Sequence, residues 1–144
     1  MKPYQAVGWM MINSSAITSI VGASTQSRIT HGMRPQASAL SSLPAINYYE
    51  MAGNRKNGVG SVPFSINCRA VTADTAINLS EKVIDLFHGS SGTGIYGDAG
   101  TTGNLFSVAR VSLRSNNGLI PEPDNGSYNV PVDILVTYPL DTVS

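Results

Sequence analysis

The residues of this chain that could bind a phosphate form a glycine-rich run, Gly92-Thr93-Gly94-Ile95-Tyr96-Gly97, which spells G-x-G-x-x-G. Such a run cradles a pyrophosphate when a strand leads into it and a helix starts from it, because the helix N-terminus then meets the phosphate. Here the run follows a predicted helix and lies among further Gly, Thr and Ser residues. This order favours a loop, and leaves a small nucleotide-binding or hydrolytic α+β enzyme as the remote alternative.

Side chains for acid–base or metal chemistry are few and scattered. The two histidines, His31 and His88, are far apart, and the only cysteine, Cys68, falls in the apolar register of a predicted strand. The three carboxylates between Ala73 and Phe87 are spaced as the solvated face of an amphipathic helix, not as a paired acid and base. We therefore predict no catalytic residue, no metal site and no cofactor.

Positive charge is the remaining candidate for a functional surface. Nine basic and nine acidic residues give a formal net charge of zero, so no overall field attracts nucleic acid. Arg69, Arg110 and Arg114 fall on predicted strands, and Arg55-Lys56 falls in a predicted turn. The strand arginines could gather on a solvated sheet face, as ordinary cross-strand charge or as a contact surface for a neighbouring subunit or DNA phosphates.

Two alternating segments and one amphipathic helix must position these residues. Gly60–Ala70 and Tyr128–Tyr138 alternate apolar and polar residues, which predicts a sheet with one buried and one solvated face. Between them, Ala73–Phe87 has apolar residues at helical spacing, with Thr72 as the N-cap. The stripe expected to face the core is Ala73, Ala76, Ile77, Val83, Ile84 and Phe87.

Shorter segments complete the predicted fold. Tyr4–Ile12 and Ala16–Val21 read as helices, Ala45–Met51 and Phe106–Arg114 as strands, and Ser24–Ser42 as polar and irregular. We expect one α+β domain spanning residues 1–144, with a small antiparallel β-sheet, helices packed on one face and long loops. No stretch approaches the roughly 20 apolar residues that a membrane-spanning helix needs, and no secretory pattern opens the chain, so we expect a cytoplasmic protein.

Three segments rich in Gly, Asn and Ser are predicted to carry the contacts with partners. They are Ala52–Gly60, expected to form a hairpin into the following strand, Gly89–Asn104 and Ser115–Ser127. Binding residues often lie on loops that project from a rigid sheet. The candidate contact residues in these loops are Asn54, Asn57, Thr93, Tyr96, Asn117 and Glu122.

Short motifs along the chain, taken in order, resemble one known family. They run from about Tyr4 to Tyr138 and comprise Ala16–Gly22, Arg28-Ile29, Leu43-Pro44-Ala45-Ile46, Tyr48-Tyr49, Arg69–Ala76 and Val132–Tyr138. With an amino-terminal helix ahead of them, they resemble the tail completion or tail terminator proteins of long-tailed bacteriophages.

The resemblance implies a structural protein of the virion, with no catalytic residue to carry over. Such proteins form a ring, expected here to be a hexamer, at the head-proximal end of the tail. The ring stops polymerisation of the tail-tube protein and offers a surface to the head-completion or connector protein. Arg55 and Lys56 could then face DNA in the lumen, and no membrane is involved.

The implied location is the head–tail interface of the virion, after assembly in the host cytoplasm. Within virion assembly, the alternative is a head-completion or neck adaptor protein of the head–tail connector.

Overall fold

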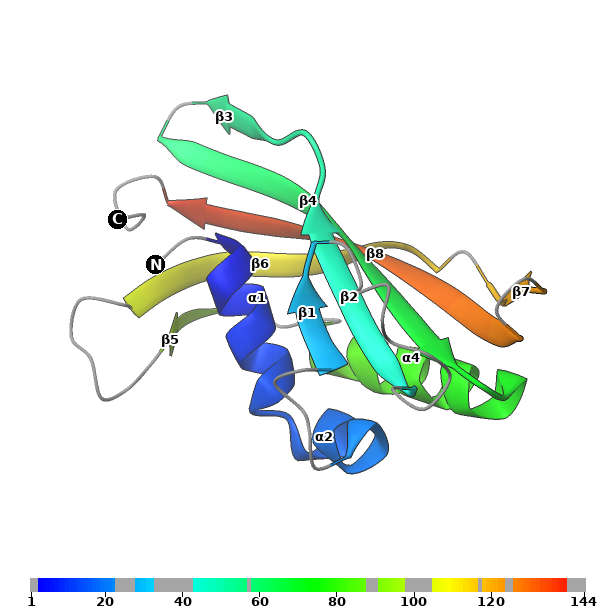
Figure 1. Ribbon diagram of the computed structural model, residues 1–144. Helices are drawn as coiled ribbons and strands as arrows, with labels where there is room; N and C mark the ends of the chain where they lie inside the picture. The colour runs from blue at the N-terminus through cyan, green and yellow to red at the C-terminus, as the bar shows by residue number, and fades with distance from the viewer. Residues whose placement is uncertain are drawn as a thin grey trace.

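The computed structural model describes residues 3–22, 28–32, 43–56, 58–87, 91–97, 105–116, 118–123 and 126–139, which form one β-sheet with helices on one face (Figure 1). The helices are α1 (Pro3–Ile12), α2 (Ser15–Val21) and α4 (Ala73–Phe87). The strands are β1 (Ile29–His31), β2 (Ala45–Glu50), β3 (Asn54–Lys56), β4 (Val59–Ala70), β5 (Ser91–Gly97), β6 (Leu105–Asn116), β7 (Ile120–Glu122) and β8 (Ser127–Pro139). The predicted α+β class is confirmed.

The strand order in the sheet is β1-β2-β4-β8-β6-β5, with β3 beside β4 and β7 beside β8. Among the described strands, β1 and β2 form a parallel pair and the other pairs are antiparallel. The long strands β4 and β8 pair from Val59–Pro139 to Ala70–Tyr128. Because side chains alternate along a strand, this register gives the sheet one apolar and one polar face.

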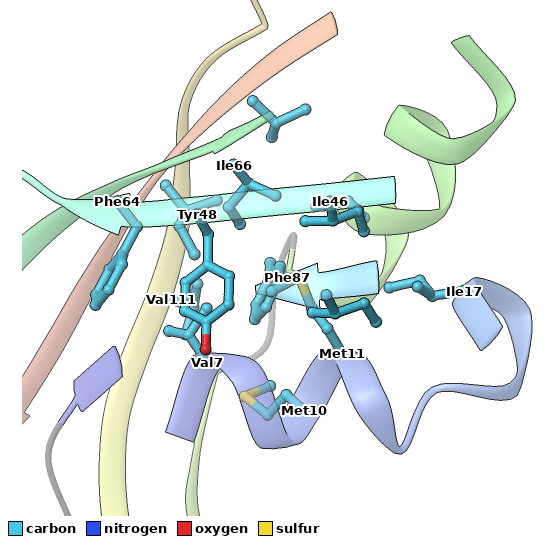
Figure 2. Close-up of a cluster of buried hydrophobic side chains, with 14 of the residues drawn as sticks. Val7, Met10, Met11, Ile17, Ile46, Tyr48, Phe64, Ile66, Phe87 and Val111 are labelled. Atoms are coloured by element: carbon cyan, nitrogen blue, oxygen red, sulfur yellow. The ribbon is translucent and has the colours of Figure 1, made fainter. Parts of the chain in front are cut away.

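The apolar face carries the core. Phe64 and Ile66 of β4 are fully buried, in one cluster with Val7, Met10 and Met11 of α1 (Figure 2). Burying a side chain of this kind contributes roughly 1.5–3 kcal/mol, so α1 is a substantial part of the core. It also lies against both end strands of the sheet, β1 and β5.

Helix α4 has the bounds that the sequence predicts. The Thr72 hydroxyl accepts a hydrogen bond from the backbone N–H of Thr75 at 3.3 Å, which caps the first turn. The expected inward stripe is wrong at one position, because Ile77 is 40% exposed. The buried residues lie on one side of the helix, at steps of one, three or four positions, and Ile77 lies beyond the edge of that side. They are Ala76, Leu79, Ser80, Val83 and Phe87.

Four short strands lie in segments that were expected to be irregular. β1 falls within Ser24–Ser42, β3 within Ala52–Gly60, β5 within Gly89–Asn104 and β7 within Ser115–Ser127. Each of them is hydrogen-bonded to a longer strand, so the neighbour supplies the pairing that the segment's own pattern does not show. The two predicted long loops are therefore partly strand, whereas the predicted hairpin from β2 into β4 is confirmed, with β3 added to it.

Candidate interaction surfaces

The hairpin of β3 and the start of β4 projects from one end of the sheet (Figure 1). Asn54 and Arg55 are exposed on β3, and Lys56 ends the strand. Gly58 has φ of 75°, the left-handed conformation that a tight hairpin turn requires. The structure thus places the predicted basic pair on a projecting hairpin. Asn57 and Asn117, like His88, lie outside the described residues.

The base of this hairpin is packed tightly against β8. A Cβ atom at Gly60 would overlap the ring of Tyr138 and come within 2.7 Å of its hydroxyl oxygen. Tyr138 is itself buried at 2% exposure, so its ring has little room to move. The close approach of strand and ring therefore leaves no room for a side chain at position 60.

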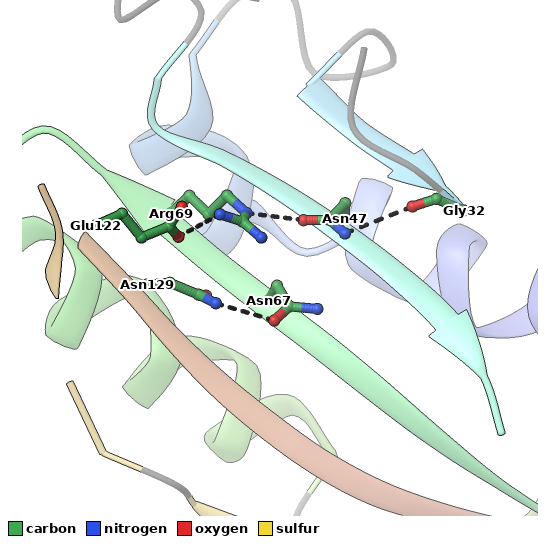
Figure 3. Close-up of polar contacts among 6 residues, drawn as sticks. All are labelled: Gly32, Asn47, Asn67, Arg69, Glu122 and Asn129. Carbon is green, nitrogen blue, oxygen red and sulfur yellow. Dashed lines mark hydrogen bonds and ion pairs between the residues drawn. The ribbon is translucent and has the colours of Figure 1, made fainter. Parts of the chain in front are cut away.

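Arg69 is the centre of a polar network on the helix-free face of the sheet (Figure 3). Its Nε donates to Asn47 Oδ1 at 3.1 Å, and Nη1 forms an ion pair with Glu122 of β7. Asn47 in turn donates from Nδ2 to the carbonyl of Gly32 at 3.4 Å. The network therefore joins β7, β4 and β2 to the end of β1, and the guanidinium of Arg69 is committed to contacts within the chain.

A second pair of amides lies beside this network. Asn129 of β8 donates from Nδ2 to Asn67 Oδ1 of β4 at 3.0 Å, and both residues are buried (Figure 3). At the base of the β7–β8 hairpin, Asn129 Oδ1 and Ser127 Oγ are buried without a hydrogen-bond partner among the described residues. Unsatisfied buried polar atoms cost stability, so these two atoms weaken this corner of the sheet.

The three strand arginines occupy different positions along the paired strands. Arg69 lies beside Asn129, near the start of β8, whereas Arg110 on β6 lies beside Thr137, near its end. Arg114 is exposed at the point where the β6–β8 register shifts. Alternation along β4 was enough to predict a solvated face. The positions of the arginines relative to one another depend on how the strands pair, which cannot be read from any one segment.

The glycine run occupies a strand. Thr93 and Tyr96 belong to β5, which pairs with β6 at the edge of the sheet. A phosphate cradle needs a strand, then a glycine turn, then a helix N-terminus, and here the run itself is the strand. The expectation that this segment is a loop is therefore wrong, and the arrangement does not support dinucleotide binding.

His31, the last residue of β1, is exposed and joins β1, β2 and α1. Its Nε2 lies 2.6 Å from Glu50 Oε1, and its ring stacks on Tyr4 with centroids 4.1 Å apart. The ring of Tyr48 lies 5.4 Å away on the other strand. Burial, followed by the charge of Glu50 and by Tyr4, raises the pKa of Tyr48 to about 12. The contact among these four residues could not be predicted from the sequence, because they come from three separate elements.

Cys68 lies in the core, as its register predicts, and burial raises the pKa of its thiol well above the usual value. Within the described ranges, no group of three or more His, Cys, Asp or Glu residues could hold a metal ion. None of the helices in that part of the chain is long and apolar enough to cross a membrane.

Comparison with known proteins identifies a shared fold. No model of a protein family matches the chain, and no curated protein matches its sequence. Among solved structures, the chain is similar to one described as "Virion of native gene transfer agent (GTA) particle", with a TM-score of 0.60 and 11% identity. The match covers 92% of this chain and 91% of that chain. At this identity, the similarity shows that the two chains share their fold over nearly their whole lengths.

Proposed function

We propose that this protein is a structural component of a phage-like virion, and specifically a tail terminator. It would form a ring at the head-proximal end of the tail, stop polymerisation of the tail-tube protein and provide the surface that the head joins. The observation that carries the proposal is the fold shared, over nearly the whole of both chains, with a chain from a gene transfer agent virion. The order of motifs in the sequence supports the same role.

The mechanism would be geometric. A closed ring satisfies the exposed end of the last tube ring and presents no surface on which another tube subunit can add. The projecting β3–β4 hairpin and the β7–β8 corner, at opposite ends of the long strands, are suited to reach different neighbours (Figure 1). A hexamer, contact with the head-completion or connector protein, and placement at the head–tail interface are parts of this proposal.

Contact with DNA in the lumen is a separate part of the proposal. Arg55 and Arg114 are exposed, with Lys56 beside Arg55 and Arg110 elsewhere on β6. Phosphate contacts by such residues would be independent of sequence and sensitive to salt. Arg69 is not offered for this contact, because Glu122 and Asn47 already bind its guanidinium.

Negative-stain microscopy of particles assembled without this gene product tests the role. We expect overlong tails without heads, restored to uniform length when the protein is supplied from a plasmid. Tails of normal length beside unattached filled heads would instead identify a neck adaptor of the head–tail connector, which the same shared fold allows. Intact particles in the absence of the protein would overturn both structural roles.

A further inference from the structure

Two side-chain oxygens on β8 are enclosed by the protein without a hydrogen bond from it. Ser127 is 2% exposed and Asn129 is 8% exposed, and Ser127 Oγ and Asn129 Oδ1 have no partner among the described residues. The two residues are two positions apart on one strand, so their side chains leave the same face of the sheet as neighbours. Buried polar atoms of folded proteins nearly always have a partner. Two such oxygens side by side therefore point to one group that binds both.

The ion pair of Arg69 and Glu122 crosses over these oxygens. Asn129 is paired with Arg69 of β4 on one side and with Ile120 of β7 on the other, so β4 and β7 flank β8. Glu122 of β7 is the strand partner of Ser127. Cross-strand partners share a face of the sheet, and Figure 3 shows the ion pair beside Asn129. The pair therefore lies across Ser127 and Asn129, which explains how polar side chains are buried on a face that carries no described helix.

The charges around the two oxygens restrict the chemistry of the group that they bind. The guanidinium of Arg69 opposes a cation, and the carboxylate of Glu122 opposes an anion. A small neutral molecule with hydrogen-bond donors remains. The hydroxyl of Ser127 can accept or donate, whereas Asn129 Oδ1 can only accept. Water offers two donors as well as acceptors, and buried water molecules in proteins typically satisfy polar groups of this kind.

We propose that one ordered water molecule is bound between β8 and the Arg69–Glu122 ion pair, donating to Ser127 Oγ and Asn129 Oδ1. Turning the amides of Asn129 and Asn67 together preserves the hydrogen bond between them and leaves an N–H group of Asn129 in place of the oxygen. The water then accepts from that group, so either orientation gives it a partner. The site does not depend on the virion role, because it uses contacts within one chain.

A high-resolution crystal structure of the full chain tests the site directly. We expect density for one water molecule about 2.5–3.2 Å from both Ser127 Oγ and the nearer amide atom of Asn129. A direct hydrogen bond between the two side chains, or the absence of density between them, would overturn the proposal. An ion held by six or more oxygen atoms at about 2.3–2.6 Å would identify a hard cation and would overturn it as well.

The sign of a stability change gives an independent test in solution. An oxygen that binds nothing costs free energy when it is buried, so its removal in Ser127→Ala would leave the unfolding equilibrium constant unchanged or lower it. If the oxygen binds the water, its removal breaks a hydrogen bond. We therefore expect Ser127→Ala to raise the constant about fivefold in urea unfolding. An unchanged or lower constant would contradict the bound water.

Ser65→Ala is the matched control for this measurement. Ser65 is another buried serine, on the same face of β4, and its Oγ is not among the buried oxygens that lack a partner. The change should alter the constant by less than about twofold. All variants are compared at one protein concentration, because association of subunits changes the apparent stability. An equal effect of the two serine changes would show that Ser127 has no special partner.

The covering ion pair provides a further test by a double-mutant cycle. In an Arg69→Ala background, solvent reaches Ser127 and Asn129 freely, so Ser127→Ala should then change the constant by less than about twofold. Glu122→Ala removes the other half of the cover, and the same result is expected in that background if Arg69→Ala does not fold. A penalty for Ser127→Ala that is as large in the uncovered protein as in the parent would show that the ion pair encloses no water.

Discussion

Arg69 shows how a single side chain can join elements that are distant in the sequence. It binds Glu122, 53 positions away, and Asn47, 22 positions away, and so connects β7, β4 and β2. The side chains of the ion pair are only 20% and 22% exposed, so solvent screens their attraction less than it would on an open surface. Arg69, which the sequence placed among the candidate surface cations, instead connects three strands on the polar face of the sheet.

A double-mutant cycle on Arg69→Met and Glu122→Gln measures this contribution. We expect a coupling free energy of about 1–2 kcal/mol in denaturant unfolding, because charge-assisted hydrogen bonds that are partly shielded contribute on this order. The same cycle on His31→Gln and Glu50→Gln is the control, since those side chains are 34% and 40% exposed and should couple by about 0.5 kcal/mol or less. Equal coupling in the two cycles would show that burial of the Arg69 pair is energetically unimportant.

At the scale of elements, the packing of α1 on β2 depends on the absence of one side chain. Gly8 lies in the middle of α1, where glycine is normally unfavourable, and a Cβ atom there would overlap the hydroxyl oxygen of Tyr48. Its next contact would be Tyr48 Cζ, at 3.1 Å. Gly8 is thus explained by the close approach of the helix to the sheet.

The change Gly8→Ala should therefore destabilise the parent by up to about 2 kcal/mol, since overpacking costs about 1–3 kcal/mol and alanine gains roughly 1 kcal/mol in a helix. In a Tyr48→Phe background, the overlapping oxygen is gone, and the same change should cost at least about 1 kcal/mol less. Unfolding in urea measures both. An equal penalty in the two backgrounds would mean that the hydroxyl contact does not set the helix position.

Elements with a pattern of their own could be predicted from the sequence. Ala73–Phe87 combines a threonine cap with apolar periodicity, and its bounds are those observed. The strands β1, β3 and β7 have three residues each, too few for alternation to show, and β5 is rich in glycine. Their pairing depends on neighbours elsewhere in the chain. The same limit applies to the candidate surfaces, because the exposure of Arg55 and the partial burial of Arg69 follow from strand register and not from residue type.

For the molecule as a whole, Tyr48 links stability to alkaline pH. Its pKa is raised from 10.0 to about 12 by burial, Glu50 and Tyr4. The folded protein therefore keeps this proton at pH values at which the unfolded chain has lost it, and the unfolding free energy should fall between pH 10 and 12. The expected loss is about 2–3 kcal/mol, with no contribution from Tyr48 below pH 10.

Unfolding across this pH range in the parent and in Tyr48→Phe isolates the effect. As the pH rises, the unfolding free energy of the parent should fall by about 2–3 kcal/mol more than that of Tyr48→Phe. The contribution of Cys68 cancels in this comparison, because both proteins contain that residue. A parent and variant whose stabilities fall in parallel would show that Tyr48 titrates as an ordinary surface tyrosine.

The placement of α1 has a consequence for the protein before it assembles. Open strand edges are templates on which chains pair without control, and covering them with a helix is one of the ways in which proteins avoid aggregation. Because α1 lies against both end strands, β1 and β5, a single helix shields the two ends of the sheet. We therefore expect the free subunit to remain dispersed while it waits for its partners, and its association to proceed through side-chain surfaces instead of through strand addition.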